Sequence, residues 1–478
     1  MCALMNEDVI KKLMKETERM GSSYSEVRME NGENESFVLK NGVLNSYSKK
    51  EYSGVSLRVL VNGSVGFAST NIINKKSLEE LVKTSIKIAK NSSRYQKEKI
   101  KLSKNKSYRK KYFVKEKIPL KNIELNEKIK YLIDVDKEAL SSNVKLPGRY
   151  YDLETSTVEK VVATSDGGFI KSLIPRVNFT YIITSMYNNK SKQMYFQYGN
   201  AGGWEFVKKW EIGKALKEEA ITLQKILKTA KTMKMKKVDA ILGPFVGSIA
   251  AHESCGHPME ADRIMGREAA QAGESFVKTG SIGEKIGSEE ATVIDDPTIP
   301  NSYGFYLFDD EGVKARPKIL YKNGVINEFL HNRETAYKTD KKSNGSSRAT
   351  YYANEPIVRM SNTYIKPGKW SFEELLKEVR NGIYIKDFME WNIDDKRWNA
   401  KYVGNEAYLI KNGELKEMIL NPVVEITTKN FWSSLKARGN DIKYFAGTCG
   451  KGDPIQGIPV FFGSPHILLK NILVGSRK

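Results

Sequence analysis

Two histidines and a glutamate lie close together in the stretch from His252 to His257. The chain has only four histidines in 478 residues, and two of them occur here, five positions apart, with Glu253 beside the first. Imidazole nitrogens are common zinc ligands, and a neighbouring carboxylate is a residue type that serves as a general base. This combination predicts a metal site with hydrolytic chemistry.

The spacing of the two histidines sets a geometric problem. An α-helix advances about 100° per residue, so positions i and i+5 point about 140° apart. A π-type bulge near Gly256 would bring the rings together, and so would a helix that ends at Gly256–Pro258. A regular helix would instead pair Glu253 with His257 as ligands and leave His252 outside the site. All three geometries remain open at this point.

A catalytic zinc ion needs about three protein ligands and one open position. The best candidate for the third ligand is Cys449, because the glycines around it allow close approach of the backbone and the nearby Lys451 favours a thiolate. Cys255 competes with it, although it shares a helical turn with the histidines. Glu260 and Asp262 are alternative ligands, or partners that orient a ligand.

Composition limits the class of protein. Lys and Arg exceed Asp and Glu by 78 − 57 = 21, and the stretch 97–117 is especially basic. We interpret this stretch as a linker, because no nucleic-acid-binding module accompanies it, and we do not expect nucleic acid as a partner. Three cysteines are too few for a disulfide framework and favour a reducing cytoplasm. We expect neither a signal peptide nor a membrane-spanning segment.

Hydrophobic periodicity predicts an α+β chain. Helical stripes at 5–21 and 78–91 alternate with strands and with Asn-Gly hairpin turns, and a long helix is expected at 204–229. After residue 266 glycine, proline and asparagine recur at short intervals, which indicates a β-rich region. The predicted units are an N-terminal α+β domain (1–95), a basic linker (96–118), a central α+β segment (119–230) and a β-rich catalytic domain (231–478).

Several blocks of sequence resemble, in order, the TldD/PmbA family of metallopeptidases. The H-E-x-x-x-H stretch at 252–257 with Glu260 and Asp262 resembles the motif of its metal-bearing, TldD-like members. The remaining blocks cover nearly the whole chain and are found at 54–59, 66–70, 309–312, 320–325, 329–333, 359–363 and 447–452. The resemblance implies an N-terminal α/β two-layer portion followed by a β-rich metallopeptidase domain.

The same resemblance implies roles for individual residues. It makes His252, His257 and Cys449 the ligands of Zn²⁺ and Glu253 the general base, and therefore favours the two-histidine geometry. His331, Arg359 and Asn362 are expected to contact a peptide or unfolded-protein substrate, because hydrogen-bond donors are needed near the carbonyl group. The family also implies a homodimer, or a heterodimer with a PmbA-like subunit.

One segment departs from the family pattern. At 386–407 the family usually has a glycine-rich segment with an aspartate before a strand. This chain instead has the sequence Asp-Phe-Met-Glu-Trp-Asn at 387–392. The departure leaves the shape of the adjoining cleft open and does not affect the metal motif. The competing function is a basic regulatory or nucleic-acid-associated protein with a structural metal site. Such a site is usually closed by four ligands.

Overall fold

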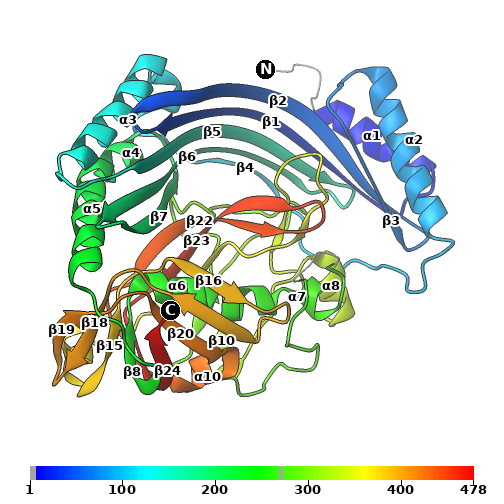
Figure 1. Cartoon of the computed structure of the whole chain (residues 1–478). Helices are drawn as coiled ribbons and strands as arrows, with labels where there is room; N and C mark the ends of the chain where they lie inside the picture. Colours follow the sequence, from blue (N-terminus) through cyan, green and yellow to red (C-terminus); the bar gives the residue numbers. More distant parts are fainter. Residues whose placement is uncertain (1–6, 269–272, 478) are drawn as a thin grey trace.

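The computed structural model describes residues 7–268 and 273–477. The N-terminal half is a long curved sheet with helices at both ends, and the C-terminal half, which is rich in strands, lies against the concave side of that sheet (Figure 1). The α+β fold class that the sequence predicts is confirmed.

The curved sheet has the strand order β3-β2-β1-β5-β6-β4, with β7 paired to β6. The sequence pattern predicts two short strands in place of each of β1 (24–29 and 36–40), β5 (149–155 and 159–164) and β6 (169–173 and 176–185), and this prediction is wrong. The polar stretch 30–35 in β1 pairs with β2 on one side and with β5 on the other. The backbone is extended there because the neighbouring strands stabilise it, although these residues have a low intrinsic preference for strands. The strands are β1 (Tyr24–Lys40), β2 (Val43–Val61), β3 (Ser64–Thr70), β4 (Arg109–Phe113), β5 (Gly148–Thr164), β6 (Phe169–Tyr187) and β7 (Lys190–Ala201).

The hairpin turns of this sheet confirm the Asn-Gly prediction. Asn41 and Gly42 have φ of 50° and 82°, and Asn62 and Gly63 have φ of 52° and 76°. Two consecutive positive φ angles are those of a type I′ turn, which matches the twist of the paired strands. The predicted helices at 5–21 and 78–91 correspond to α1 (Glu7–Arg19) and α2 (Lys75–Ser92), and the first two predicted helical residues lie outside the described residues.

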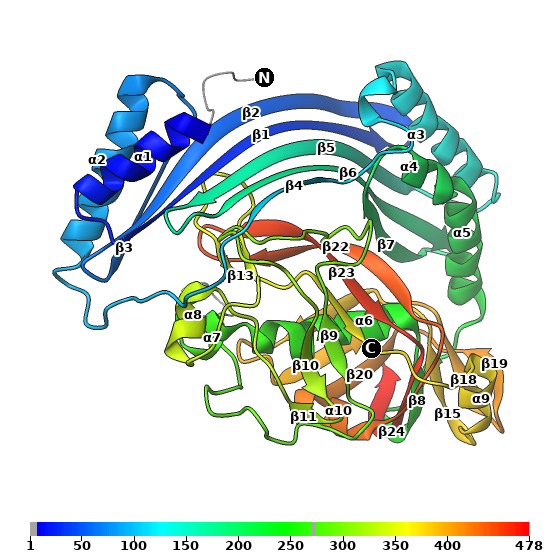
Figure 2. The ribbon, with the colours of Figure 1, turned by 180° about the vertical axis from the view of Figure 1, so that it is seen from behind.

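The basic stretch at 97–117 is more than a linker. Its residues Arg109–Phe113 form β4, which pairs in parallel with β6 at the edge of the curved sheet (Figure 2). Strands from the predicted segments 1–95, 96–118 and 119–230 therefore share one sheet. The positions of the domain boundaries stay a prediction.

Helices at the other end of the sheet connect it to the C-terminal half. The single helix predicted at 204–229 is two helices, because Glu211 adopts a left-handed φ of 46° between them. These helices and the one before them are α3 (Leu125–Leu140), α4 (Glu205–Lys209) and α5 (Ile212–Thr229).

The C-terminal half contains two main sheets. The first has the order β16-β17-β20-β24-β8-β15-β18-β19 with β21 on β24, and the second has the order β11-β10-β9-β14-β23-β22. The strands are β8 (Lys236–Leu242), β9 (Val293–Asp295), β10 (Lys318–Lys322), β11 (Val325–Ile326), β12 (Ser347–Arg348), β13 (Ile357–Val358), β14 (Asn362–Ile365), β15 (Asn381–Ile385), β16 (Glu390–Ile393), β17 (Asn399–Val403), β18 (Ala407–Lys411), β19 (Glu414–Met418), β20 (Pro422–Thr427), β21 (Leu435–Arg438), β22 (Lys443–Lys451), β23 (Gln456–Ser464) and β24 (Ile467–Ser476).

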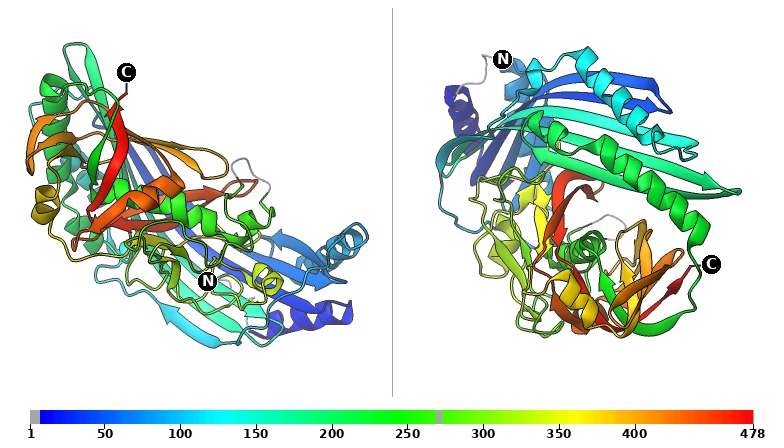
Figure 3. Two further views of the ribbon diagram at one scale, coloured as in Figure 1. Left: turned by 90° about the horizontal axis from the view of Figure 1, so that it is seen from below. Right: turned by 90° about the vertical axis from the view of Figure 1, so that its left-hand side faces the viewer.

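Short helices complete this half. They are α6 (Pro244–Ala251), α7 (Ala261–Ile264), α8 (Arg333–Lys338), α9 (Phe372–Lys377) and α10 (Thr428–Ser434). Helix α6 lies between the two sheets, and the hairpin β22–β23 lies between α6 and the curved sheet (Figure 3). Phe196 of β7, Phe245 of α6 and Phe445 of β22 pack against one another, so one hydrophobic core joins the two halves. None of the helices in residues 7–268 and 273–477 has both the length and the apolar composition needed to cross a membrane.

Candidate metal centre

The histidine motif lies at the end of a fully buried helix. All residues of α6 are buried, because its sequence is apolar or small and it packs against β14, β22 and β23. Gly243 separates it from β8, and Pro244 is its first residue, a position at which proline is compatible with a helix start. The sheet and the helix therefore fix the position at which His252 leaves the helix.

A π turn solves the spacing problem. His252–Gly256 is a π-helical turn, and the N–H of His257 donates to the carbonyl oxygen of His252. This i to i+5 hydrogen bond joins the two histidines themselves, and their ring centroids are 4.9 Å apart. Of the three geometries that the sequence leaves open, the π-type bulge is the one present, followed by a 3₁₀ turn at His257–Met259, and the regular-helix geometry is wrong.

Surrounding side chains stabilise this unusual turn. The carbonyl oxygen of Ser254 accepts hydrogen bonds from the hydroxyl of Tyr321 at 3.2 Å and from the indole N–H of Trp432 at 3.4 Å. A methyl group at Gly256 would lie 1.9 Å from the sulfur of Met360, so a larger residue there would displace Met360 or the turn. The π turn is therefore fixed by tertiary contacts, which a helical periodicity does not reveal.

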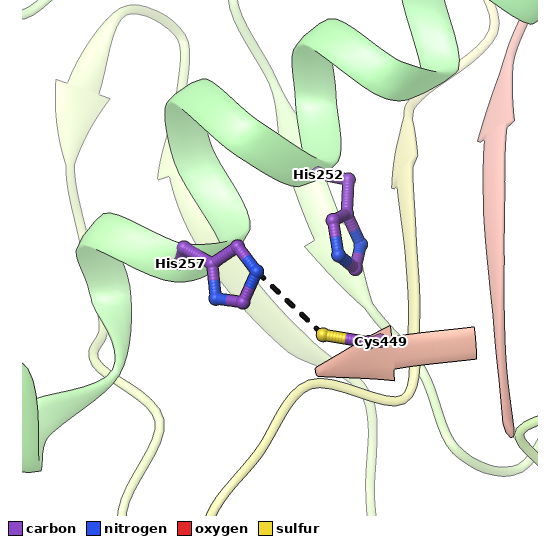
Figure 4. A group of neighbouring side chains, drawn as sticks. All are labelled: His252, His257 and Cys449. Atoms are coloured by element: carbon purple, nitrogen blue, oxygen red, sulfur yellow. Dashed lines mark hydrogen bonds between the residues drawn. The ribbon is translucent and has the colours of Figure 1, made fainter. Parts of the chain in front are cut away.

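Cys449 reaches the histidines from a distant strand. It lies on β22 opposite Ile458 of β23, and its Sγ is 3.6 Å from Nε2 of His257. Candidate ligand atoms of His252, His257 and Cys449 all lie within 4.8 Å of one another, and the three side chains converge on one point (Figure 4). All three residues are buried. Cys255 is also buried, but it is not a member of this group among the described residues.

The geometry of this group fits a zinc ion. Bond lengths of about 2.3 Å to sulfur and about 2.0–2.1 Å to nitrogen at a tetrahedral centre separate the two ligand atoms by about 3.6 Å. That is the distance between Sγ of Cys449 and Nε2 of His257. In addition, Nδ1 of His252 is buried and has no hydrogen-bond partner among the described residues. A buried polar atom of this kind is costly unless a ligand compensates for it.

Glu260 orients the second histidine. Its Oε2 lies 3.0 Å from Nδ1 of His257 and accepts a hydrogen bond of 2.6 Å from Arg263. A carboxylate at Nδ1 leaves Nε2 free to face Cys449, as in many zinc sites. Burial by itself would raise the pKa of Glu260, but the charges of Lys451, His257 and Arg263 hold that pKa well below its usual value. Glu260 is therefore an orienting partner.

The thiol of Cys449 is activated by neighbours other than the predicted lysine. Lys451 donates to Asp262 at 2.6 and 2.8 Å and to the carbonyl oxygen of Val358. Burial alone would raise the pKa of Cys449, but the charges of His257 and Arg359 outweigh it and lower that pKa to about 7. The site thus favours the thiolate, which is the form that binds metal.

Glu253 also lies in the centre and has a partner that sequence reasoning missed. Its Oε2 accepts a hydrogen bond of 2.6 Å from Nη1 of Arg397. Burial would raise the pKa of Glu253, but the charges of His257 and Arg397 lower it overall. Arg397 is 144 residues away, in the turn between β16 and β17, and no motif or periodicity indicates its role.

The three predicted substrate-binding residues are buried. Both terminal nitrogens of Arg359 donate to carbonyl oxygens of the β22–β23 hairpin, at Cys449 and Gln456. The side-chain amide of Asn362 donates a hydrogen bond to the carbonyl oxygen of Asp296 and accepts one from the N–H of Phe461. His331 is adjacent to the segment that pairs with Glu260, and its Nδ1 lies 3.1 Å from the hydroxyl of Thr335. Their contact with a substrate stays a prediction.

Family models describe almost the whole of this chain. The C-terminal domain of the PmbA/TldA metallopeptidases matches residues 235–476, the metallopeptidase domain 1 matches 25–89, and the central domain matches 118–224. The chain belongs to this family. The PmbA/TldA C-terminal domain contains both histidines and Cys449.

Individual relatives agree with this assignment. A metalloprotease of Methanocaldococcus jannaschii is 32% identical over 96% of this chain and 97% of its own length. A zinc metalloprotease TldD homolog of Saccharolobus solfataricus is 25% identical over 97% of this chain and 99% of its own length. The crystal structure of TldE from Thermococcus kodakarensis has the same fold, with a TM-score of 0.74 at 18% identity, over 97% of this chain and 99% of that chain.

Proposed function

We propose that this PmbA/TldA family member is a zinc-dependent peptidase that hydrolyses peptides or unfolded polypeptide segments, with Glu253 as the general base. The observation that carries the proposal is the convergence of His252, His257 and Cys449, with Glu253 on the same π turn. Membership of a metallopeptidase family supports the reaction class, and one relative is named a zinc metalloprotease.

The proposed ligands are His252, His257 and Cys449. A zinc ion bound there would supply an acidified water and a Lewis acid for the peptide carbonyl group. The chain's own contribution is orientation, because Glu260 holds the ring of His257 and Arg359 holds the strand that carries Cys449. Such partners of metal ligands control both affinity and geometry.

Glu253 has the position and the charge for proton transfer. Its pKa is lowered, so it is ionised at neutral pH and ready to accept a proton from the attacking water. After the carbon–nitrogen bond breaks, the same carboxyl group returns the proton to the leaving amine. The buried surroundings of Glu253 exclude bulk water from this exchange.

The number of ligands argues against the competing function. A structural zinc site is normally closed by four protein ligands. Among the described residues the cluster of candidate metal ligands has three members, and an acid lies beside it, which leaves a position for water. The regulatory or nucleic-acid-associated alternative is therefore not favoured.

The test combines metal content with activity. Zinc stoichiometry and cleavage of fluorogenic unstructured peptides are measured for the wild type, for Glu253→Gln and for the exposed control Glu425→Gln. We expect Glu253→Gln to retain zinc and to lose about 10²–10⁴-fold in kcat, because general base catalysis has that magnitude. The control should match the wild type. Unchanged cleavage by Glu253→Gln would contradict the assignment of the base.

A further inference from the structure

In the hydrolysis proposed above, a bound zinc ion would polarise the carbonyl group, and a hydrogen-bond donor from the protein would stabilise the carbonyl oxygen further. Negative charge develops on that oxygen in the transition state, and fixed hydrogen-bond donors in a buried site stabilise it strongly. Both terminal nitrogens of Arg359 donate to carbonyl oxygens of the β22–β23 hairpin, and its Nε is buried without a hydrogen-bond partner among the described residues. Most donors of Arg359 therefore hold the strand that carries Cys449, and a donor that also contacts Glu253 is the better candidate.

Arg397 has three features that point to this role. Its Nη1 donates to Glu253 at 2.6 Å, and its side chain is only 11% exposed. Its Nε is buried and has no hydrogen-bond partner among the described residues. A guanidinium group has five N–H donors in a rigid fork, so the bond to Glu253 leaves capacity for a second acceptor.

The backbone of Arg397 is also unusual. Its φ is 62°, a left-handed conformation that an arginine rarely adopts. Residues held in such conformations are concentrated at functional sites, where the surrounding structure fixes them. The β16–β17 turn thus places in a left-handed position an arginine whose guanidinium group contacts the base and whose Nε is buried and unpaired among the described residues.

The turn that carries Arg397 is firmly held. The N–H of Arg397 donates to the carbonyl oxygen of Asp394 at 2.9 Å, and its own carbonyl oxygen accepts from the hydroxyl of Thr428 at 2.6 Å. The carboxylate of Asp394 accepts from the N–H of Trp398 at 2.7 Å. The guanidinium group is therefore positioned before any substrate binds, which is what an effective donor requires.

We propose that Arg397 is a further catalytic residue, whose guanidinium group donates a hydrogen bond to the carbonyl oxygen of the scissile peptide bond. The inference rests on the proposed peptidase function. Arg397 makes and breaks no covalent bond and keeps its proton, while Glu253 carries out the proton transfer. Its positive charge neutralises part of the charge that develops on the oxygen.

Tyr402 is the competing donor. Its hydroxyl is buried, on β17, close to the turn that carries Arg397. Burial raises its pKa, the charge of Glu253 raises it further, and a hydrogen bond with Ser254 lowers it in part. Tyr402→Phe therefore tests the alternative directly, because it removes the hydroxyl and keeps the ring.

The experiment measures transition-state binding as well as turnover. The variants are Arg397→Met, Arg397→Lys, Tyr402→Phe and the control Lys396→Ala, whose side chain is 67% exposed on the same turn. For each zinc-loaded protein, kcat and KM are measured with a fluorogenic peptide, and the dissociation constant of a phosphonamidate peptide is measured by calorimetry. The phosphonamidate imitates the tetrahedral transition state, so its affinity reports donors to the oxygen.

We expect Arg397→Met to lose about 10²–10³-fold in kcat with little change in KM, the magnitude for one such donor. Arg397→Lys should recover part of the loss, and Lys396→Ala should match the wild type. Phosphonamidate affinity should also fall when Arg397→Met is combined with Glu253→Gln. No further fall in that background would mean that Arg397 acts only through Glu253 and would overturn the proposal.

Two other outcomes separate this inference from the function on which it rests. If the wild type hydrolyses no peptide, the proposed function fails and this inference fails with it. If the wild type is active and Arg397→Met is equally active, only this inference fails. A loss confined to Tyr402→Phe would assign the donor to the tyrosine and overturn the role of Arg397.

Discussion

Gly256 provides a direct test of the π turn. A methyl group at this position would lie 1.9 Å from Sδ of Met360, whereas ordinary contacts of this kind begin at about 3.4 Å. The sulfur or the turn must therefore move by about 1.5 Å, and Met360 is fully buried. Overpacking of a core costs about 1–3 kcal/mol, so we expect Gly256→Ala to lower the free energy of unfolding by that amount.

A second substitution should relieve the overlap. Met360→Ala alone leaves a cavity and should cost about 2–5 kcal/mol. In the double variant the new methyl group occupies space that the sulfur has vacated. Its loss in free energy of unfolding should therefore be smaller than the sum of the two single losses by about 1–2 kcal/mol, which is within the usual range for residues in contact. Zinc affinity should fall in Gly256→Ala and recover in part in the double variant.

The assay is urea unfolding of each metal-free variant, followed by zinc titration. Gly280→Ala is the control, because a methyl group there meets nothing within 4 Å and its φ is not left-handed. That control should change the free energy of unfolding by no more than about 0.5 kcal/mol. Strict additivity of Gly256→Ala and Met360→Ala would refute the close packing of Met360 against the π turn.

Two further predictions concern the partners of the site. Glu260→Gln should weaken zinc binding by about 10–100-fold in competition with a chromophoric chelator, because the carboxylate that orients His257 is lost; unchanged affinity would contradict that role. Burial lowers the pKa of His331 from 6.5 to about 4, so the unfolded chain takes up its proton first as the pH falls. As the pH falls from 6.5 to 4, this residue should therefore lower the free energy of unfolding by up to about 3 kcal/mol. Above pH 6.5 it should cause no loss of stability. The free energy of unfolding is measured with urea at pH 7 and pH 5, and its decrease between the two pH values should be smaller in His331→Leu than in the wild type. An identical decrease in both proteins would show that another group is responsible.

Local patterns predict much of this structure. The Asn-Gly pairs at 323–324 and 412–413, like those of the curved sheet, have positive φ at both residues and connect β10 to β11 and β18 to β19. Turn chemistry of this kind depends on the two residues alone, so a sequence reveals it. The i+5 spacing of His252 and His257 likewise predicts a distorted helix, because no regular helix brings the rings together.

Features that depend on distant contacts are not visible in the sequence. Strand β4 forms from a lysine-rich stretch because β6 pairs with it, and β1 stays extended through polar residues because it has partners on both sides. Arg397 reaches Glu253 from a turn that lies 144 residues away in the sequence. Such contacts join elements that no local pattern connects.

X-ray absorption spectroscopy at the zinc edge tests the central claim most directly. The zinc-loaded wild type should show one sulfur at about 2.3 Å together with nitrogen or oxygen at about 2.0–2.1 Å. In Cys449→Ser the sulfur shell should disappear, while the exposed control Lys396→Ala should keep it. A spectrum without sulfur in the wild type, or a sulfur shell that survives in Cys449→Ser, would contradict the zinc site of His252, His257 and Cys449.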